Sequence, residues 1–153
     1  MPPEASLLED GEGAFATGVS RYLDFRPGRA EPLSRIYIPF QIAGGDLWQL
    51  ALVDTRGHFF VPGSDVLELI HQELGESFDQ TSLLTASGRI EGELHRLSIT
   101  LIAVEGQDLQ VDTTAFISPQ WDGPSILGYT EFLERIRFAV DPERNLFYFG
   151  PRS

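Results

Sequence analysis

The sequence predicts an all-β, barrel-like fold with one or two short helices. Apolar residues alternate with polar ones in many short segments, which is the period of strands with one buried face. Breaks containing glycine or proline separate these segments, as at Pro62-Gly63-Ser64 and Glu105-Gly106-Gln107-Asp108. Helical spacing is clearest over Ser64–Ile70 and Glu131–Arg137. Many short strands with few helices are typical of an all-β barrel.

The first 34 residues are predicted to form an N-terminal arm. Residues 1–13 are acidic, contain proline and glycine, and show little periodicity. Residues 15–25 have apolar side chains at the spacing of a short helix, although Gly18 weakens that pattern. Arg26-Pro27-Gly28-Arg29 predicts a turn.

The folded domain is predicted to span residues 35–150. It begins with the alternating strand Arg35–Ile42, in which Pro39 indicates an edge strand or a break in the ladder. A turn at residues 43–46 leads into a second strand, and residues 83–104 and 109–117 predict further strands. Residues 138–149 predict a closing hairpin. Its residues Phe147-Tyr148-Phe149 would be an apolar edge strand, and such a strand is usually paired with a partner or covered.

One apolar run ends in a carboxylate. Leu50-Ala51-Leu52-Val53 leads directly into Asp54-Thr55, and a continuous apolar run of this kind predicts a strand buried on both faces. An ionised carboxylate at the end of such a strand is costly unless it is paired, hydrogen-bonded or used in chemistry. Taken alone, Asp54 also fits an ordinary turn. A second segment, Ile126-Leu127-Gly128 followed by Glu131–Ile136, favours a functional interpretation.

Together the two segments resemble the retropepsin-like aspartic proteases, the single-domain relatives of pepsin. That family carries an apolar strand ending in Asp-Thr/Ser-Gly-Ala/Ser, then two apolar residues and a glycine before a short helix. Leu52–Thr55 fits the first part, and Ile126–Gly128 fits the second. The resemblance covers roughly residues 36–150. It implies a single-lobe acid-protease fold, a closed barrel with one or two short helices.

The resemblance also implies roles for named residues. Asp54 and Thr55 would be catalytic, and Ile126, Leu127 and Gly128 would form the structural psi-loop beside them. Arg56 and Gly57 occupy positions that contact substrate. Ser87, Gly88 and Arg89 fall about where the substrate-covering flap turns, although such a tip also fits a plain hairpin turn.

The mechanism implied by the resemblance needs two carboxylates that share a proton, one acting as acid while the other activates water. One chain of this size supplies one such aspartate. The resemblance therefore implies a homodimer in which Asp54 of each copy meets across the two-fold axis, with Thr55 holding the loops together. The partners are a peptide or protein substrate and a second copy of the chain.

Arg56 departs from the family pattern, because it stands where the family has glycine. A guanidinium in the cleft would favour ionisation of both carboxylates and so remove the shared proton. Two functions are therefore open. One is an aspartic endopeptidase that hydrolyses peptide bonds, impaired by Arg56. The alternative is a catalytically inactive pseudo-protease that serves as a peptide-binding or dimerisation module.

A weaker echo of the Asp54 segment occurs at Gln110-Val111-Asp112-Thr113. The two aspartates are too close in sequence for each to belong to its own complete lobe. We expect Asp112 to occupy the structural position of Asp54 in an internal duplication and not to be catalytic.

Composition excludes several other functions. The formal net charge is −12, with 23 acidic residues against 11 basic ones, so nucleic-acid and membrane-surface binding are disfavoured. There is no cysteine, the three histidines are dispersed, and no phosphate-binding loop or nucleophile elbow occurs, so we expect no metal and no cofactor. The chain lacks a long apolar run and begins without a signal-peptide pattern, which favours a cytoplasmic location.

Overall fold

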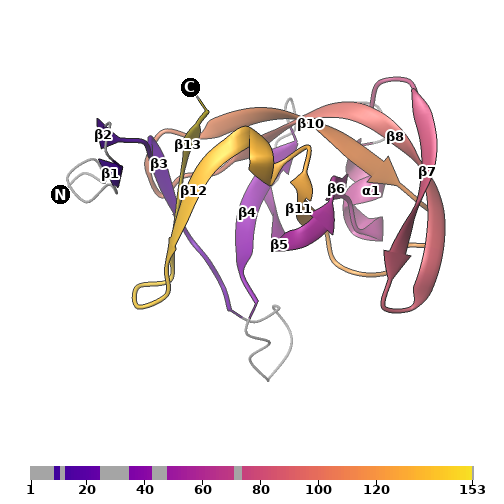
Figure 1. Cartoon of the computed structure of the whole chain (residues 1–153), viewed down its shortest axis with the longest axis horizontal. Helices are drawn as coiled ribbons and strands as arrows, with labels where there is room; N and C mark the ends of the chain where they lie inside the picture. Colours follow the sequence, from indigo (N-terminus) through magenta and orange to yellow (C-terminus); the bar gives the residue numbers. More distant parts are fainter. Residues whose placement is uncertain (1–8, 11–12, 25–34, 43–47, 71–73, 153) are drawn as a thin grey trace.

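The computed structural model describes residues 9–10, 13–24, 35–42, 48–70 and 74–152. Strands make up most of this part, with one short α-helix and one 3-10 turn, so the predicted all-β class is confirmed (Figure 1). In chain order the elements are β1 (Glu9–Asp10), β2 (Gly13–Ala14), β3 (Gly18–Arg21), β4 (Tyr37–Ile42), β5 (Trp48–His58), β6 (Phe60–Val61), α1 (Ser64–Ile70), β7 (Asp79–Thr85), β8 (Gly88–Leu101), β9 (Glu105–Gly106), β10 (Leu109–Ile117), β11 (Ile126–Thr130), η2 (Leu133–Arg135), β12 (Ile136–Asp141) and β13 (Leu146–Pro151).

The larger sheet has the strand order β10-β6-β11-β5-β4-β8-β7, and β10 also pairs with β8. Six strands therefore close into a ring, with β7 added outside β8. The joints at β6 are short: β6 meets β10 at the single pair Ala115–Phe60 and meets β11 at two pairs. The strand pairing thus forms a closed ring, as predicted, but the short joints at β6 mean that the sheet is not a regular barrel.

β5 is an interior strand of this sheet. It pairs antiparallel with β4 on one side and parallel with β11 on the other. Its residue Ala51 belongs to the main core, whose largest fully buried side chains include Phe40, Phe60 and Leu127, and the neighbouring Leu52 is also buried. The core therefore fixes the strand that carries Asp54.

A second, four-stranded sheet has the order β12-β13-β3-β9. Figure 1 shows it at the opposite end of the molecule from the β7–β8 hairpin. β13 lies inside this sheet, because β3 pairs with the edge that β12 leaves open. Phe147, Tyr148 and Phe149 are buried within the single chain. The prediction that they form an apolar edge strand is therefore wrong.

The short helix expected over residues 15–25 is also absent from the described residues 15–24, which contain β3 instead. Gly18 indicates the reason. A Cβ atom at Gly18 would lie 2.2 Å from the backbone oxygen of Gln107 and 2.8 Å from the Phe149 ring. The glycine that weakens a helix thus permits β3 to pack closely between β9 and β13.

Three smaller expectations have mixed outcomes. The helix over Ser64–Ile70 is confirmed, whereas residues 131–137 contain only the 3-10 turn η2 before β12 begins. β4 is an interior strand and not an edge. Its ladder with β8 nevertheless starts at Phe40, so Pro39 lies just outside that ladder. Proline has no backbone N–H to donate, and none is needed at this position.

Some expectations fall outside the described residues, namely the turns at residues 26–29 and 43–46 and most of the first 13 residues. The domain boundary at residues 34–35 stays a prediction. None of the helices in the described part of the chain reaches the length and apolarity of a membrane-spanning helix.

We predict that deleting residues 1–24 destabilises the protein and causes it to self-associate. The deletion removes β3, so one edge of β13 loses its partner and an unpaired edge strand promotes association. Sedimentation and thermal unfolding measure both effects. A matched deletion of residues 1–12, which leaves β3 intact, serves as the control. Equal stability and size of the two truncated proteins would contradict the role given to β3.

Candidate active site

The site is built where β5 leaves its ladder with β11. Asp54 lies opposite Gly128, and the next pair joins His58 to Thr130. Thr55, Arg56 and Gly57 thus form a small loop that bulges from the ladder opposite a single residue, Tyr129. The backbone N–H of Arg56 donates to Oδ1 of Asp54 at 3.0 Å, and the Asp54 carboxylate is held against its own loop.

Gly128 has a steric reason to be glycine. Its N–H donates to the backbone oxygen of Phe59 at 2.8 Å. A Cβ atom there would lie 2.7 Å from that oxygen and 2.8 Å from the carbonyl carbons of Gly57 and His58, all of them backbone atoms. The two strands can therefore approach this closely only without a side chain at Gly128. Beside it, Leu127 is fully buried in the core.

The loop ends at a second anchor. Nδ1 of His58 and the hydroxyl of Thr130 are 2.8 Å apart. Phe59 follows with a φ of 67°, a conformation that bulky side chains rarely adopt and that turns the chain into β6. The Asp54 loop is thus held at both ends by β11.

A cavity of about 440 Å³ opens beside this loop. Leu52, Asp54, Arg56 and His58 all line it, as expected for alternate residues on one face of a strand. The opposite wall comes from the β7–β8 hairpin, and the remaining wall from the segment before β11. These two walls contribute Leu83, Leu84, Thr85, Ala86, Ser87, Ile90, Trp121, Asp122, Pro124 and Ile126.

The predicted flap residues lie at the tip of that hairpin. Ser87 lines the cavity, and Gly88 makes the turn with a φ of 117°. Arg89 does not line the cavity; it donates to Oγ of Ser82 on the neighbouring strand at 2.9 Å. Sequence reasoning missed Leu84, which lines the cavity although its side chain is 75% exposed. The apolar pair Leu83-Leu84, shortly before the predicted flap tip, is the sequence feature that could have indicated this wall of the cavity.

The other predicted site residues are also placed by the structure. Gly57 and Ile126 line the cavity, whereas Thr55 is exposed on the loop and Leu127 is buried behind it. The Arg56 side chain is exposed, and within the described residues its guanidinium makes no ion pair with Asp54. Asp54 is therefore contacted by the backbone of Arg56 and not by its charge.

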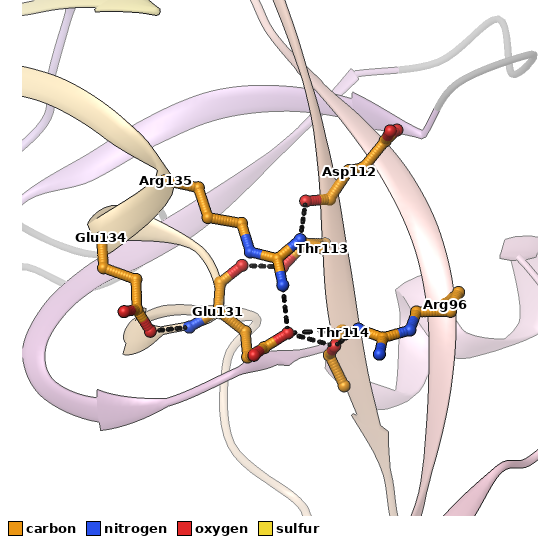
Figure 2. Close-up of polar contacts among 7 residues, drawn as sticks. All are labelled: Arg96, Asp112, Thr113, Thr114, Glu131, Glu134 and Arg135. Carbon is orange, nitrogen blue, oxygen red and sulfur yellow. Dashed lines mark hydrogen bonds and ion pairs between the residues drawn. The ribbon is translucent and has the colours of Figure 1, made fainter. Parts of the chain in front are cut away.

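A second polar cluster lies next to η2, just after β11, and is centred on Glu131 (Figure 2). Oε2 of Glu131 accepts hydrogen bonds from Oγ1 of Thr114 at 2.7 Å and from Nη1 of Arg96 at 3.2 Å, and it also accepts from Arg135. The hydroxyl of Thr113 donates to the backbone oxygen of Glu131 at 2.9 Å. These contacts hold Glu131 at a φ of 71° and tie the end of β11 to β8 and β10.

The same contacts perturb the ionisation of Glu131. Chiefly the hydrogen bond from Thr114, and then the charges of Arg135 and Arg96, hold the pKa of Glu131 below its ordinary value of 4.5, while partial burial acts in the opposite direction. The ionised form is thus the one that the fold stabilises.

Asp112 does not occupy the position equivalent to Asp54. It lies within β10, and its carboxylate accepts a hydrogen bond from Ser98. The parallel contact of β10 with β6 occurs at Ala115, three residues later. The expectation from the internal echo is therefore wrong, and Asp112 does not line the cavity. Nor do the described residues contain a group of His, Asp or Glu side chains arranged to hold a metal ion.

Comparison with solved structures identifies the fold. The chain is similar to the crystal structure of a retropepsin-like aspartic protease from Rickettsia conorii, with a TM-score of 0.56 and 20% sequence identity. The match covers 86% of this chain and 98% of the other. No protein-family profile matches the sequence, and no curated protein matches it. The likeness therefore establishes the retropepsin-like fold.

We predict that Gly128→Ala destabilises the protein by about 1–3 kcal/mol, because the added methyl group meets backbone on three sides. Chemical denaturation measures the loss. Gly75→Ala is the matched control, since its Cβ atom would have one ordinary contact, at 3.8 Å. If both variants unfold at the same denaturant concentration, the close approach at Gly128 is not a constraint.

We also predict that Glu131→Gln costs about 1–2 kcal/mol of stability at neutral pH and much less in acid. A carboxylate with a lowered folded pKa contributes stability above its unfolded pKa, and that contribution is lost as the pH falls through the folded pKa. Denaturant midpoints of both proteins at neutral and acidic pH measure this. Glu143→Gln, an exposed substitution in the β12–β13 turn, is the control. A cost that is the same at every pH would refute the role of the ionised form.

Proposed function

We propose that this chain is one half of a homodimeric, retropepsin-like aspartic endopeptidase, with Asp54 from each copy forming the catalytic dyad. The observation that carries the proposal is the position of Asp54. It lies on β5 opposite Gly128, directly before the Thr55–Gly57 loop, and lines a cavity whose opposite wall is a hairpin. The retropepsin-like fold supports the same assignment.

The chemistry requires a second carboxylate close to Asp54, and no other carboxylate of the described residues except Asp122 lines the cavity. Asp122 lies in the wall before β11 and is exposed. A second copy, brought together by two-fold symmetry, supplies an identical Asp54 loop. One carboxylic acid then protonates the substrate carbonyl oxygen while the other carboxylate takes a proton from the attacking water.

The structure limits which surface can form the dimer. The terminal strand β13 is already paired on both edges within one chain. We therefore place the contact at the Asp54 loops themselves. Thr55 is exposed there, and Tyr129, which faces the loop across the ladder, has 49% of its surface exposed. Thr55 of one copy would hydrogen-bond to the loop of the other.

We predict that Asp54→Asn abolishes cleavage of a denatured protein at mildly acidic pH, because an amide cannot share the proton. Fragment formation is measured by mass spectrometry, with and without pepstatin. Asp112→Asn is the matched control, since that carboxylate lies outside the cavity. Cleavage that survives in Asp54→Asn, or a 17.0 kDa monomer that persists on concentration, would refute the dyad.

We further predict that Arg56→Gly raises cleavage of this substrate by at least tenfold. Arg56 lines the same cavity as Asp54, so two copies bring two guanidinium groups into a dimeric site and occupy space that glycine would leave to the substrate backbone. The variant is made alone and together with Gly57→Ala. The single change is the cleaner test, because a Cβ atom at Gly57 would lie 3.2 Å from Oδ2 of Asp54. An unchanged rate in both variants would remove Arg56 from the catalytic argument.

A further inference from the structure

The cavity is more basic than the rest of the chain. Two arginines, Arg35 and Arg56, line it against two carboxylates, Asp54 and Asp122. The whole chain has 23 acidic residues against 11 arginines and lysines. A cleft in which arginines balance the carboxylates repels anionic groups less than the rest of this negatively charged protein does.

The two arginines flank Asp54. Tyr37 pairs with Leu52, and the N–H of Val53 donates to the oxygen of Ile36 at 2.8 Å. Continuing this register by one residue places Arg35 opposite Asp54, on the β4 side. Arg56 lies two residues beyond Asp54 on β5, on the same face of that strand. One arginine thus lies just before β4, and the other lies on β5 itself, two residues after Asp54.

Neither guanidinium has a partner in the part of the chain that the structure describes. Arg96 and Arg135 bind Glu131, Arg152 donates to the oxygen of Glu134, and Arg89 donates to Ser82. By contrast, the side chains of Arg35 and Arg56 are exposed and have no hydrogen-bond or ion-pair partner among the described residues. An arginine without a partner among these residues is available to bind a carboxylate, which it matches in shape and charge.

We propose that the cleft selects peptides with an aspartate or glutamate next to the bond to be cleaved, held by Arg35 and Arg56. The proposal rests on the proposed protease function and names its substrate class. It also gives Arg56 a purpose. A substrate carboxylate that binds the guanidinium neutralises the positive charge that Arg56 brings into the cavity. Uncharged peptides leave that charge in place.

The test uses two pools of synthetic ten-residue peptides with a reduced, uncleavable central bond. The pools are identical except that glutamate beside that bond in one is glutamine in the other. Binding to the intact protein is measured by fluorescence anisotropy at about pH 6, where peptide glutamate is ionised. We expect the glutamate pool to bind about tenfold more tightly, as for a hydrogen bond to a charged group, and the preference to weaken with salt.

The variants Arg35→Gln and Arg56→Gln should each reduce the preference to about twofold. Arg144→Gln, which removes the same charge from the exposed β12–β13 turn, should leave it unchanged. Equal binding of the two pools to the unmodified protein, or an equal loss in Arg144→Gln, overturns the inference.

Peptides of the same two sequences with a normal, cleavable central bond distinguish this inference from the proposed function, because both binding and cleavage are measured with them. Preferential binding of the glutamate pool without any cleavage would leave an acidic-peptide site and refute the protease. Cleavage of both sequences at the same rate would leave the protease and refute the selection.

Discussion

The close crossing of β11 and the loop after Asp54 is the constraint on which the site depends. At Gly128 the backbones approach so closely that a single added methyl group would meet three backbone atoms. The crossing fixes where β5 ends, and so where the Asp54 carboxylate lies, because the N–H of Gly128 is bonded to the oxygen of Phe59. A carboxylate placed on a rigid backbone needs little reorganisation before reaction, which is what preorganised catalysis requires.

The contacts of Glu131 extend this constraint into the rest of the chain. The chain leaves the crossing at Thr130 and turns immediately through a left-handed residue, Glu131, whose side chain and backbone bind β8 and β10. Such a backbone conformation costs about 1–3 kcal/mol and persists only where its surroundings impose it. The cluster therefore serves the Asp54 loop indirectly, as the fixed point at which β11 ends after its crossing. Because the pKa of its central carboxyl is lowered from 4.5, this support is kept at mildly acidic pH and is lost only in stronger acid.

Much of the fold and of the candidate site could be predicted from the sequence, and the predictions that were wrong have physical causes. The apolar run before Asp54 and the pair before Gly128 were readable because a buried strand and a close backbone approach each leave a local signature. The strand at residues 18–21 was not, because its alternation is short and its partners, β13 and β9, lie far along the chain. For the same reason Phe147 was mistaken for an edge residue. Contacts between side chains distant in sequence, such as that of Thr114 with Glu131, leave no local pattern at all.

Arg56 contributes both to the loop that holds Asp54 and to the lining of the cavity. Its backbone N–H holds the Asp54 carboxylate, a contact that any residue except proline can make at this position. Its side chain lines the cavity and has no hydrogen-bond or ion-pair partner among the described residues. The family glycine is therefore not needed for the loop to form. In the proposed dimer the dyad with its shared proton carries one negative charge and two copies of Asp122 carry two more, against four positive charges from two copies of Arg35 and Arg56. This imbalance is unfavourable for an empty site and for a neutral peptide, and an acidic substrate reduces it. The residue that departs from the retropepsin-like pattern is thus the one to which we assign substrate choice in the proposed protease.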